Sequence, residues 1–112
     1  GTLHYTMKAQ AFERKLHRDL PPTYLWGYNS SYPGPTFEVW ADNAVKITWE
    51  NDLRNLTSGE LLSHHHFPTE PVCLHGPDMW GQAARIVTHL HGAHTWAIFD
   101  GQPDKSLLPG EK

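Results

Sequence analysis

The chain has 112 residues, which is enough for one domain, and its hydrophobic share of 38% is sufficient to form a core. Nine Lys and Arg residues against twelve Asp and Glu residues give a formal net charge of −3, which excludes the basic surface typical of nucleic-acid binding. No apolar stretch approaches the roughly 20 residues that span a bilayer, and the amino terminus lacks the pattern of a signal peptide. We therefore expect neither a nucleic acid nor a membrane as the partner.

Helix signals are scarce along the chain, and its nine prolines and nine glycines favour short elements joined by turns. Residues Tyr5–Ala11 alternate apolar and polar side chains, which predicts a half-buried strand. The stretch Asp19-Leu20-Pro21-Pro22-Thr23 interrupts it, because proline removes a backbone donor. A short apolar run at Leu25–Tyr28 precedes a second breaker, Tyr32-Pro33-Gly34-Pro35.

A β-hairpin is predicted next, with Thr36–Trp40 paired to Ala44–Glu50 around a turn at Ala41-Asp42-Asn43. The apolar side chains of this hairpin occupy alternate positions: Phe37, Val39, Val45, Ile47 and Trp49. We expect them to pack partly against residues of another chain, because the β-sandwich would be unfinished in this chain.

Residues 51–82 are irregular, polar and proline-containing, and a loop of this length is usually functional or a subunit contact. A further strand is predicted at Arg85–Leu90, and a turn at Asp100-Gly101-Gln102-Pro103. Short strands linked by Pro/Gly turns indicate an all-β sandwich or barrel.

The most informative motif is His89-Leu90-His91-Gly92, at the end of the last predicted strand. Alternate residues of an extended strand share one face, so the two imidazoles are expected to point the same way. Imidazole is a preferred ligand of copper, zinc and iron, and two convergent rings form half of a metal site. A pair of ordinary surface histidines is the alternative, in a chain that has nine.

Other metal sites are conceivable from composition alone. A mononuclear blue-copper site would use Cys73, His75 and Met79, although Cys73 and His75 are only two residues apart. A structural thiol and a solvent-facing histidine are the alternative for these positions. A zinc site would need further ligands from His94, His75 or the run His64-His65-His66, which is more typical of a solvated loop.

Four blocks in order resemble the amino-terminal cupredoxin domain of multicopper oxidases, in the branch of the spore-coat laccase, phenoxazinone synthase and bilirubin oxidase. The blocks are Leu16-His17-Arg18-Asp19-Leu20-Pro21-Pro22-Thr23, Leu25-Trp26-Gly27-Tyr28-Asn29, Pro33-Gly34-Pro35-Thr36-Phe37-Glu38-Val39 and Thr88-His89-Leu90-His91-Gly92. The resemblance implies a cupredoxin-like Greek-key β-sandwich that is incomplete in this chain. Residues 1–112 would form the amino-terminal part of the first cupredoxin domain.

The resemblance also implies a chemistry. In that family, a type 1 copper accepts electrons from phenols or aromatic amines, and a trinuclear copper cluster reduces dioxygen to water. Carried over, His89 would ligate the type 2 copper and His91 one of the type 3 coppers. Asp100-Gly101 resembles the turn that follows this pair, so Asp100 would help to deliver protons; its alternative role is that of a turn former.

The remaining ligand blocks of the family, including the His-Cys-His block of the type 1 site, are not in this sequence. The resemblance therefore implies a fragment or small subunit that works with the rest of the oxidase as a second polypeptide. The reducing substrate would dock near the type 1 copper, outside this chain. The alternative function is a non-catalytic cupredoxin-like module that binds a metal or a protein.

Overall fold

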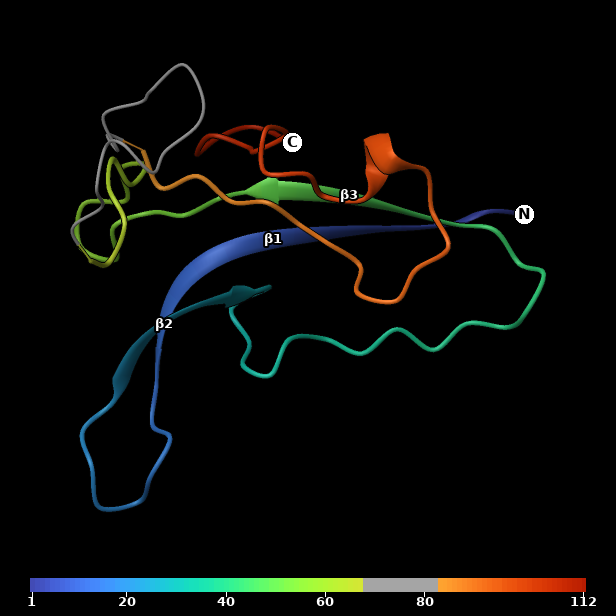
Figure 1. Cartoon of the computed structure of the whole chain (residues 1–112). Helices are drawn as coiled ribbons and strands as arrows, with labels where there is room; N and C mark the ends of the chain where they lie inside the picture. Colours follow the sequence, from blue (N-terminus) through green and yellow to red (C-terminus); the bar gives the residue numbers. More distant parts are fainter. Residues whose placement is uncertain (68–82) are drawn as a thin grey trace.

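Three strands form a single sheet in the computed structural model, which describes residues 1–67 and 83–112. The strands are β1 (Leu3–Arg14), β2 (Thr23–Tyr28) and β3 (Val45–Asn51), and their order in the sheet is β2-β1-β3 (Figure 1). The one helix of the described residues is a single 3₁₀ turn at Ala97–Phe99. No helix in this part of the chain is long and apolar enough to cross a membrane. The all-β prediction is thus confirmed, and the sheet represents part of a cupredoxin-like domain.

Strand β1 is central because its two halves pair with different neighbours. Its second half, Ala9–Arg14, pairs antiparallel with β2 across a proline-containing connection, as the breaker at residues 19–23 suggested. Its first half, Leu3–Ala9, pairs parallel with β3. The side chains of Met7, Ala9 and Ala11 alternate toward the core, so the predicted half-buried strand at 5–11 is confirmed.

The predicted antiparallel hairpin between 36–40 and 44–50 is wrong. The second segment does form β3, but its ladder partner is β1, and residues 36–40 belong to no strand. The periodicity located a strand at the second segment correctly but carried no information on its partner. Phe37 instead packs its ring against Tyr5 of β1, with centroids 5.1 Å apart, while Trp40 is 83% exposed.

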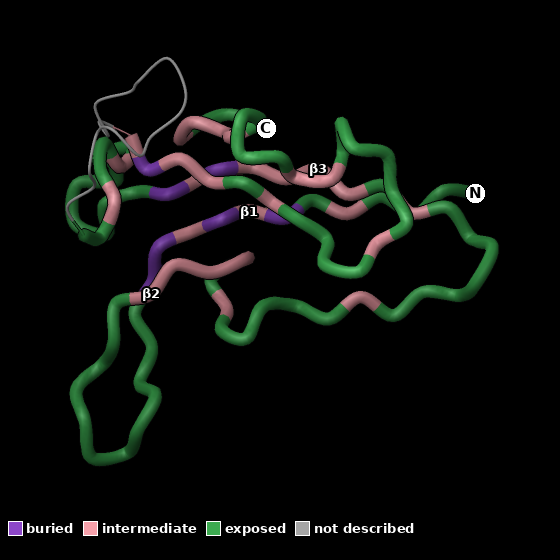
Figure 2. Tube along the Cα trace, viewed as in Figure 1, coloured by how far each residue is buried: buried purple, intermediate pink, exposed green. Residues whose placement is uncertain are grey.

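A small buried core lies where β1 meets the residues that follow β3 (Figure 2). The buried apolar residues of the described chain are Met7, Ala9, Ala11, Phe12, Leu53 and Ala84. Ala9, Leu53 and Ala84 form one cluster, and Trp26, Tyr28, Leu62 and Ile86 pack against it and are only partly buried. Because the core is small, much of the molecule's order depends on polar contacts between segments.

Asn51, at the end of β3, makes the most important of these contacts and is 1% exposed. Its Nδ2 donates to the carbonyl oxygens of Ala84 at 2.8 Å and Leu107 at 2.9 Å. Its Oδ1 accepts from the backbone N–H of Leu53 at 3.3 Å. Its backbone N–H and carbonyl also bond to Glu111 and Gly110. One side chain and its peptide groups therefore fasten the carboxyl-terminal third of the chain to the sheet.

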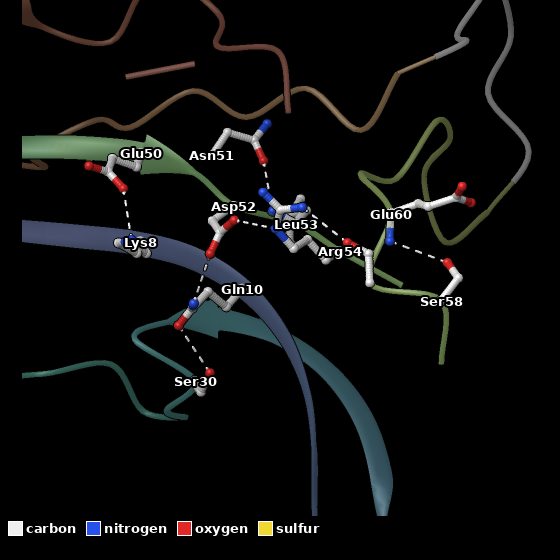
Figure 3. A network of polar contacts seen from close by, with 11 residues as sticks. Lys8, Gln10, Ser30, Glu50, Asn51, Asp52, Leu53, Arg54, Ser58 and Glu60 are labelled. Carbon is white, nitrogen blue, oxygen red and sulfur yellow. Dashed lines mark hydrogen bonds and ion pairs between the residues drawn. The ribbon is translucent and has the colours of Figure 1, made fainter. Parts of the chain in front are cut away.

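A second polar network joins β1 to the residues that follow β3 (Figure 3). Asp52 accepts hydrogen bonds from Gln10 at 3.0 Å and from Arg54 at 2.7 Å. Burial alone raises the pKa of Asp52, but the hydrogen bonds from Arg54 and Gln10 and the charges of Arg54 and Lys8 outweigh it, so the pKa lies below its ordinary value of 3.8. Beside this network, Lys8 forms an ion pair with Glu50 at 3.3 Å.

Residues 83–112 lie along the sheet and carry the predicted metal ligands (Figure 1). The strand predicted at 85–90 is wrong as a continuous element, because it forms only one isolated bridge, between Ile86 and Leu107. Within the described residues no neighbouring strand offers it a longer ladder. The segment is held by this bridge and by Asn51 rather than by a sheet.

Candidate metal centre

The turn that carries the two histidines projects from this anchored segment. The backbone N–H of Ala93 donates to the carbonyl oxygen of Leu90 at 3.1 Å, which closes a turn over the motif. Gly92 has a positive φ of 78°, a conformation that costs glycine little. Both histidines are exposed; His89 precedes this turn and His91 lies within it, and neither belongs to a strand.

The turn nevertheless brings the two imidazoles together, as the sequence predicted. The ring centroids of His89 and His91 lie 5.9 Å apart, and the ring planes are inclined by 45°. The side chain of His89 is 48% exposed. Two neighbouring, accessible imidazoles are a donor set that suits copper or zinc, and they leave room for ligands from elsewhere.

Asp100 lies against His89, so the third predicted residue belongs to the same site. The Nδ1 of His89 is hydrogen-bonded to the backbone carbonyl oxygen of Asp100, and the Oδ1 of the carboxylate is 3.4 Å from the same nitrogen. A carbonyl can only accept, so Nδ1 carries the hydrogen and the lone pair of the neutral ring is on Nε2. The site thus presents Nε2 of His89 as the nitrogen available to a metal.

The backbone on the other side of His89 is held by a contact that the sequence did not predict. The hydroxyl groups of Thr88 and Tyr28 are 3.1 Å apart, which ties the start of the motif to the end of β2. The ring of Tyr28 in turn packs against Trp49 of β3, with centroids 5.1 Å apart. The sequence offered one signal for this contact, because Tyr28 carries a polar hydroxyl in the otherwise apolar run Leu25–Tyr28.

The other histidines of the alternative zinc site lie in different surroundings. The ring of His66 stacks on Trp26 at a centroid distance of 4.2 Å and meets Tyr24 edge-on at 4.8 Å. Together with His66, the side chains of His64 and His65 line a small pocket of about 220 Å³. Cys73, His75 and Met79, the alternative blue-copper set, lie outside the described residues.

No group of three or more His, Cys, Asp or Glu side chains in the described ranges is arranged to hold a metal ion. Two imidazoles are fewer ligands than a complete copper or zinc centre has.

Comparison with known proteins identifies the family of this chain. The family model for multicopper oxidases matches residues 11–82. The chain is 36% identical over 102 residues to a laccase of Bacillus subtilis (strain 168), an alignment covering 90% of this chain and 18% of that protein. It is 36% identical over 117 residues to a laccase of Haloferax volcanii, covering 98% and 19%. It is 32% identical over 103 residues to the multicopper oxidase LPR2 of Arabidopsis thaliana, covering 88% and 16%.

The all-β fold and the family match together define the class of domain, and this family implies copper. The match over residues 11–82 makes the assignment specific: the chain belongs to the multicopper oxidase family. It spans less than a fifth of the length of each of these three relatives.

Proposed function

We propose that this chain is the amino-terminal part of a laccase-like multicopper oxidase and supplies His89 and His91 to its trinuclear copper cluster. The observation that carries the proposal is the pairing of the two imidazoles, whose centroids are 5.9 Å apart, together with the Asp100 carbonyl that holds the ring of His89. Membership of the family and the order of the four sequence blocks support the same assignment. The oxidase would couple one-electron oxidation of phenols or aromatic amines to four-electron reduction of dioxygen.

Each residue of the site has a distinct part in this proposal. His89 would bind the type 2 copper through Nε2, because its Nδ1 is already hydrogen-bonded to Asp100. His91 would bind a neighbouring type 3 copper. When bound, the coppers accept electrons one at a time and deliver them to dioxygen, and the imidazoles suit both oxidation states of copper.

Protons must also reach the oxygen atoms, because dioxygen becomes two waters only by taking up four of them. The Asp100 carboxylate lies 3.4 Å from the His89 ring and is 35% exposed, so it touches both the site and solvent. A carboxylate in this position accepts a proton from water and releases it toward the site. The backbone carbonyl of the same residue holds His89, so the two parts of Asp100 have separate tasks.

The remaining part of the oxidase would be the partner of this chain. Four large apolar side chains near the histidines are strongly exposed: Leu90 at 67%, Trp96 at 79%, Ile98 at 62% and Phe99 at 73%. Such a concentration of exposed apolar side chains is typical of a surface that a partner covers. The missing copper ligands would come from the same covering segments.

The test is His89→Ala in the complete, copper-loaded oxidase, with His17→Ala as the matched control. His17 is an exposed histidine in the connection between β1 and β2, distant in sequence from the site. We expect His89→Ala to lose the type 2 copper signal in electron paramagnetic resonance and to stop consuming oxygen. The type 1 site would still accept an electron, so the blue absorption would bleach with a methoxyphenol.

Full oxygen consumption in copper-replete His89→Ala would contradict the proposal. A complete protein that contains no His-Cys-His sequence and retains no copper would instead favour a non-catalytic cupredoxin-like module. The His17→Ala enzyme, with unchanged copper content and turnover, would exclude a general effect of removing a histidine.

A further inference from the structure

Gly101 packs unusually closely against the backbone that carries His89. Its φ is +73°, and a Cβ built on it would overlap the carbonyl oxygen of Thr88. The same Cβ would lie 2.8 Å from the Cα of His89, whereas real Cβ atoms essentially never approach another heavy atom within 3.0 Å. The obstructing atoms are backbone, so a side chain at this position would have to displace the turn or the histidine peptide.

Because Gly101 has no side chain, the Asp100–Gly101 turn can lie close to the Thr88–His89 peptide. The same turn orients the imidazole of His89. The carbonyl oxygen of Asp100, the preceding residue, accepts the hydrogen bond from Nδ1 of His89. The position of this carbonyl therefore depends on how near residues 100–101 can come to residues 88–89. Moving the turn outward by a few tenths of an ångström would lengthen and misalign that bond.

We propose that Gly101 is a positioning residue for His89. By having no side chain, it lets the Asp100–Gly101 turn dock on the Thr88–His89 peptide, so that the Asp100 carbonyl keeps the hydrogen on Nδ1 and leaves Nε2 as the copper-binding nitrogen. Gly101 itself contacts no metal. This inference rests on the function proposed above, because it assigns a role toward the copper that His89 would bind.

Two effects of replacing Gly101 must be separated: the cost of a positive φ and the loss of close packing. Gly59 offers a matched control, since its φ is also +73° and a Cβ built on it meets nothing within 4 Å. Replacing either glycine by alanine introduces the same backbone penalty, about 1 kcal/mol. Only replacement of Gly101 pushes against the histidine peptide.

The experiment compares Gly101→Ala, Gly59→Ala and the unchanged sequence in the complete, copper-loaded oxidase. We expect Gly101→Ala to change the hyperfine splitting of the type 2 copper in electron paramagnetic resonance. We also expect it to release that copper to a chelator at about 10-fold to 100-fold lower chelator concentration, the usual effect of losing a partner that orients a metal ligand. Gly59→Ala should match the unchanged enzyme in both measurements.

Unchanged hyperfine splitting and copper retention in folded Gly101→Ala would overturn the inference. If His89→Ala loses the type 2 copper in the same series, the proposed function stands and only the role of Gly101 falls. If His89→Ala retains it, the proposed function itself fails.

If Gly101→Ala does not fold, the unchanged enzyme still decides the question. In its reduced, diamagnetic copper(I) form with ¹⁵N-labelled histidine, nuclear magnetic resonance assigns the hydrogen of the His89 ring. A hydrogen on Nδ1 supports the inference, and a hydrogen on Nε2 overturns it.

Discussion

The junction at Asn51 and the turn next to His89 both depend on polar groups, but they differ in how many of these groups have hydrogen-bond partners. Asn51 is 1% exposed, and its amide donates to two carbonyls and accepts from one backbone N–H. His89 is about half exposed, and among the described residues its ring is hydrogen-bonded only through Nδ1. The side-chain amide of Asn51 is thus satisfied inside the fold, whereas Nε2 of His89, the nitrogen proposed above to bind copper, has no hydrogen bond within residues 1–67 and 83–112.

This difference separates stability from function along the chain. A buried amide whose partners lie on three segments stabilises the fold, and removing it leaves the Ala84 carbonyl and the Leu53 N–H without this partner. An exposed imidazole oriented on one side contributes little to folding but is ready to bind a metal. Changes at the junction should therefore affect unfolding first, and changes at the turn should affect copper and turnover first.

The largest effect that would sharpen the comparison is expected for Asn51→Ala. The Ala84 carbonyl and the Leu53 N–H lose their partner, while the Leu107 carbonyl keeps the N–H of Ile86. We therefore expect the free energy of unfolding of the complete protein to fall by about 3 kcal/mol. Urea denaturation measures this. The control is Asn55→Ala, whose side chain accepts from two backbone N–H groups but is exposed, with an expected loss of about 1 kcal/mol. Equal losses in the two variants would break the comparison.

The next effect concerns turnover and is expected for Asp100→Asn. The backbone carbonyl that holds His89 is retained, so copper content and unfolding should stay nearly constant. Loss of the proton-accepting carboxylate should slow oxygen consumption about 100-fold, increasingly so as pH rises and protons become scarce. Oxygen-electrode measurements across pH, with copper determined in the same samples, check this. Unchanged turnover at every pH would leave Asp100 with a turn-forming role only.

A smaller effect is expected for Tyr28→Phe, which removes only the hydroxyl that contacts Thr88. The ring would still pack on Trp49, so the loss of stability should be about 1 kcal/mol, the usual contribution of one hydrogen bond. Thermal unfolding of the complete oxidase measures it. A matched Tyr5→Phe variant, altered in a ring that packs on Phe37, should change stability by less.

The smallest effect is expected at Asp52, through pH. Because the pKa of Asp52 is lowered in the folded protein, its ionised form stabilises the fold above the ordinary pKa of 3.8, and this contribution is lost as pH falls through the lowered value. Asp52→Asn should therefore be less stable than the unchanged protein at neutral pH, by less than about 1 kcal/mol, and the difference should shrink in acid. Urea denaturation at a series of pH values tests the sign. A difference that grows in acid would contradict it.

Parts of the fold could be read from the sequence because they depend on local pattern. The alternation at 5–11 and at 45–49 identified two strands, since a half-buried strand requires it. The pairing of β3 with β1 could not be read, because periodicity identifies a buried face and not the strand that lies beside it. The same limit explains the error at 85–90, where an apolar run is held by Asn51 and one bridge.

The residues of the candidate site were likewise predicted only in part. His89 and His91 followed from their spacing, and Asp100 from the family resemblance, and the structure brings all three together. Gly101 and Tyr28 were not predicted as parts of the site. Their contributions are a close backbone approach and one hydroxyl contact, which depend on how distant segments meet. The local sequence pattern does not predict contacts between segments that are distant in the chain.

The central position of β1 has a consequence for handling the protein. Since β1 lies between its two partners, β2 is an outer strand, and no further strand pairs with it among residues 1–67 and 83–112. Open strand edges are templates for pairing with other chains. Produced on its own, this sequence would be prone to self-association through that edge. Co-expression with the partner polypeptide proposed above is therefore the sound route to soluble material.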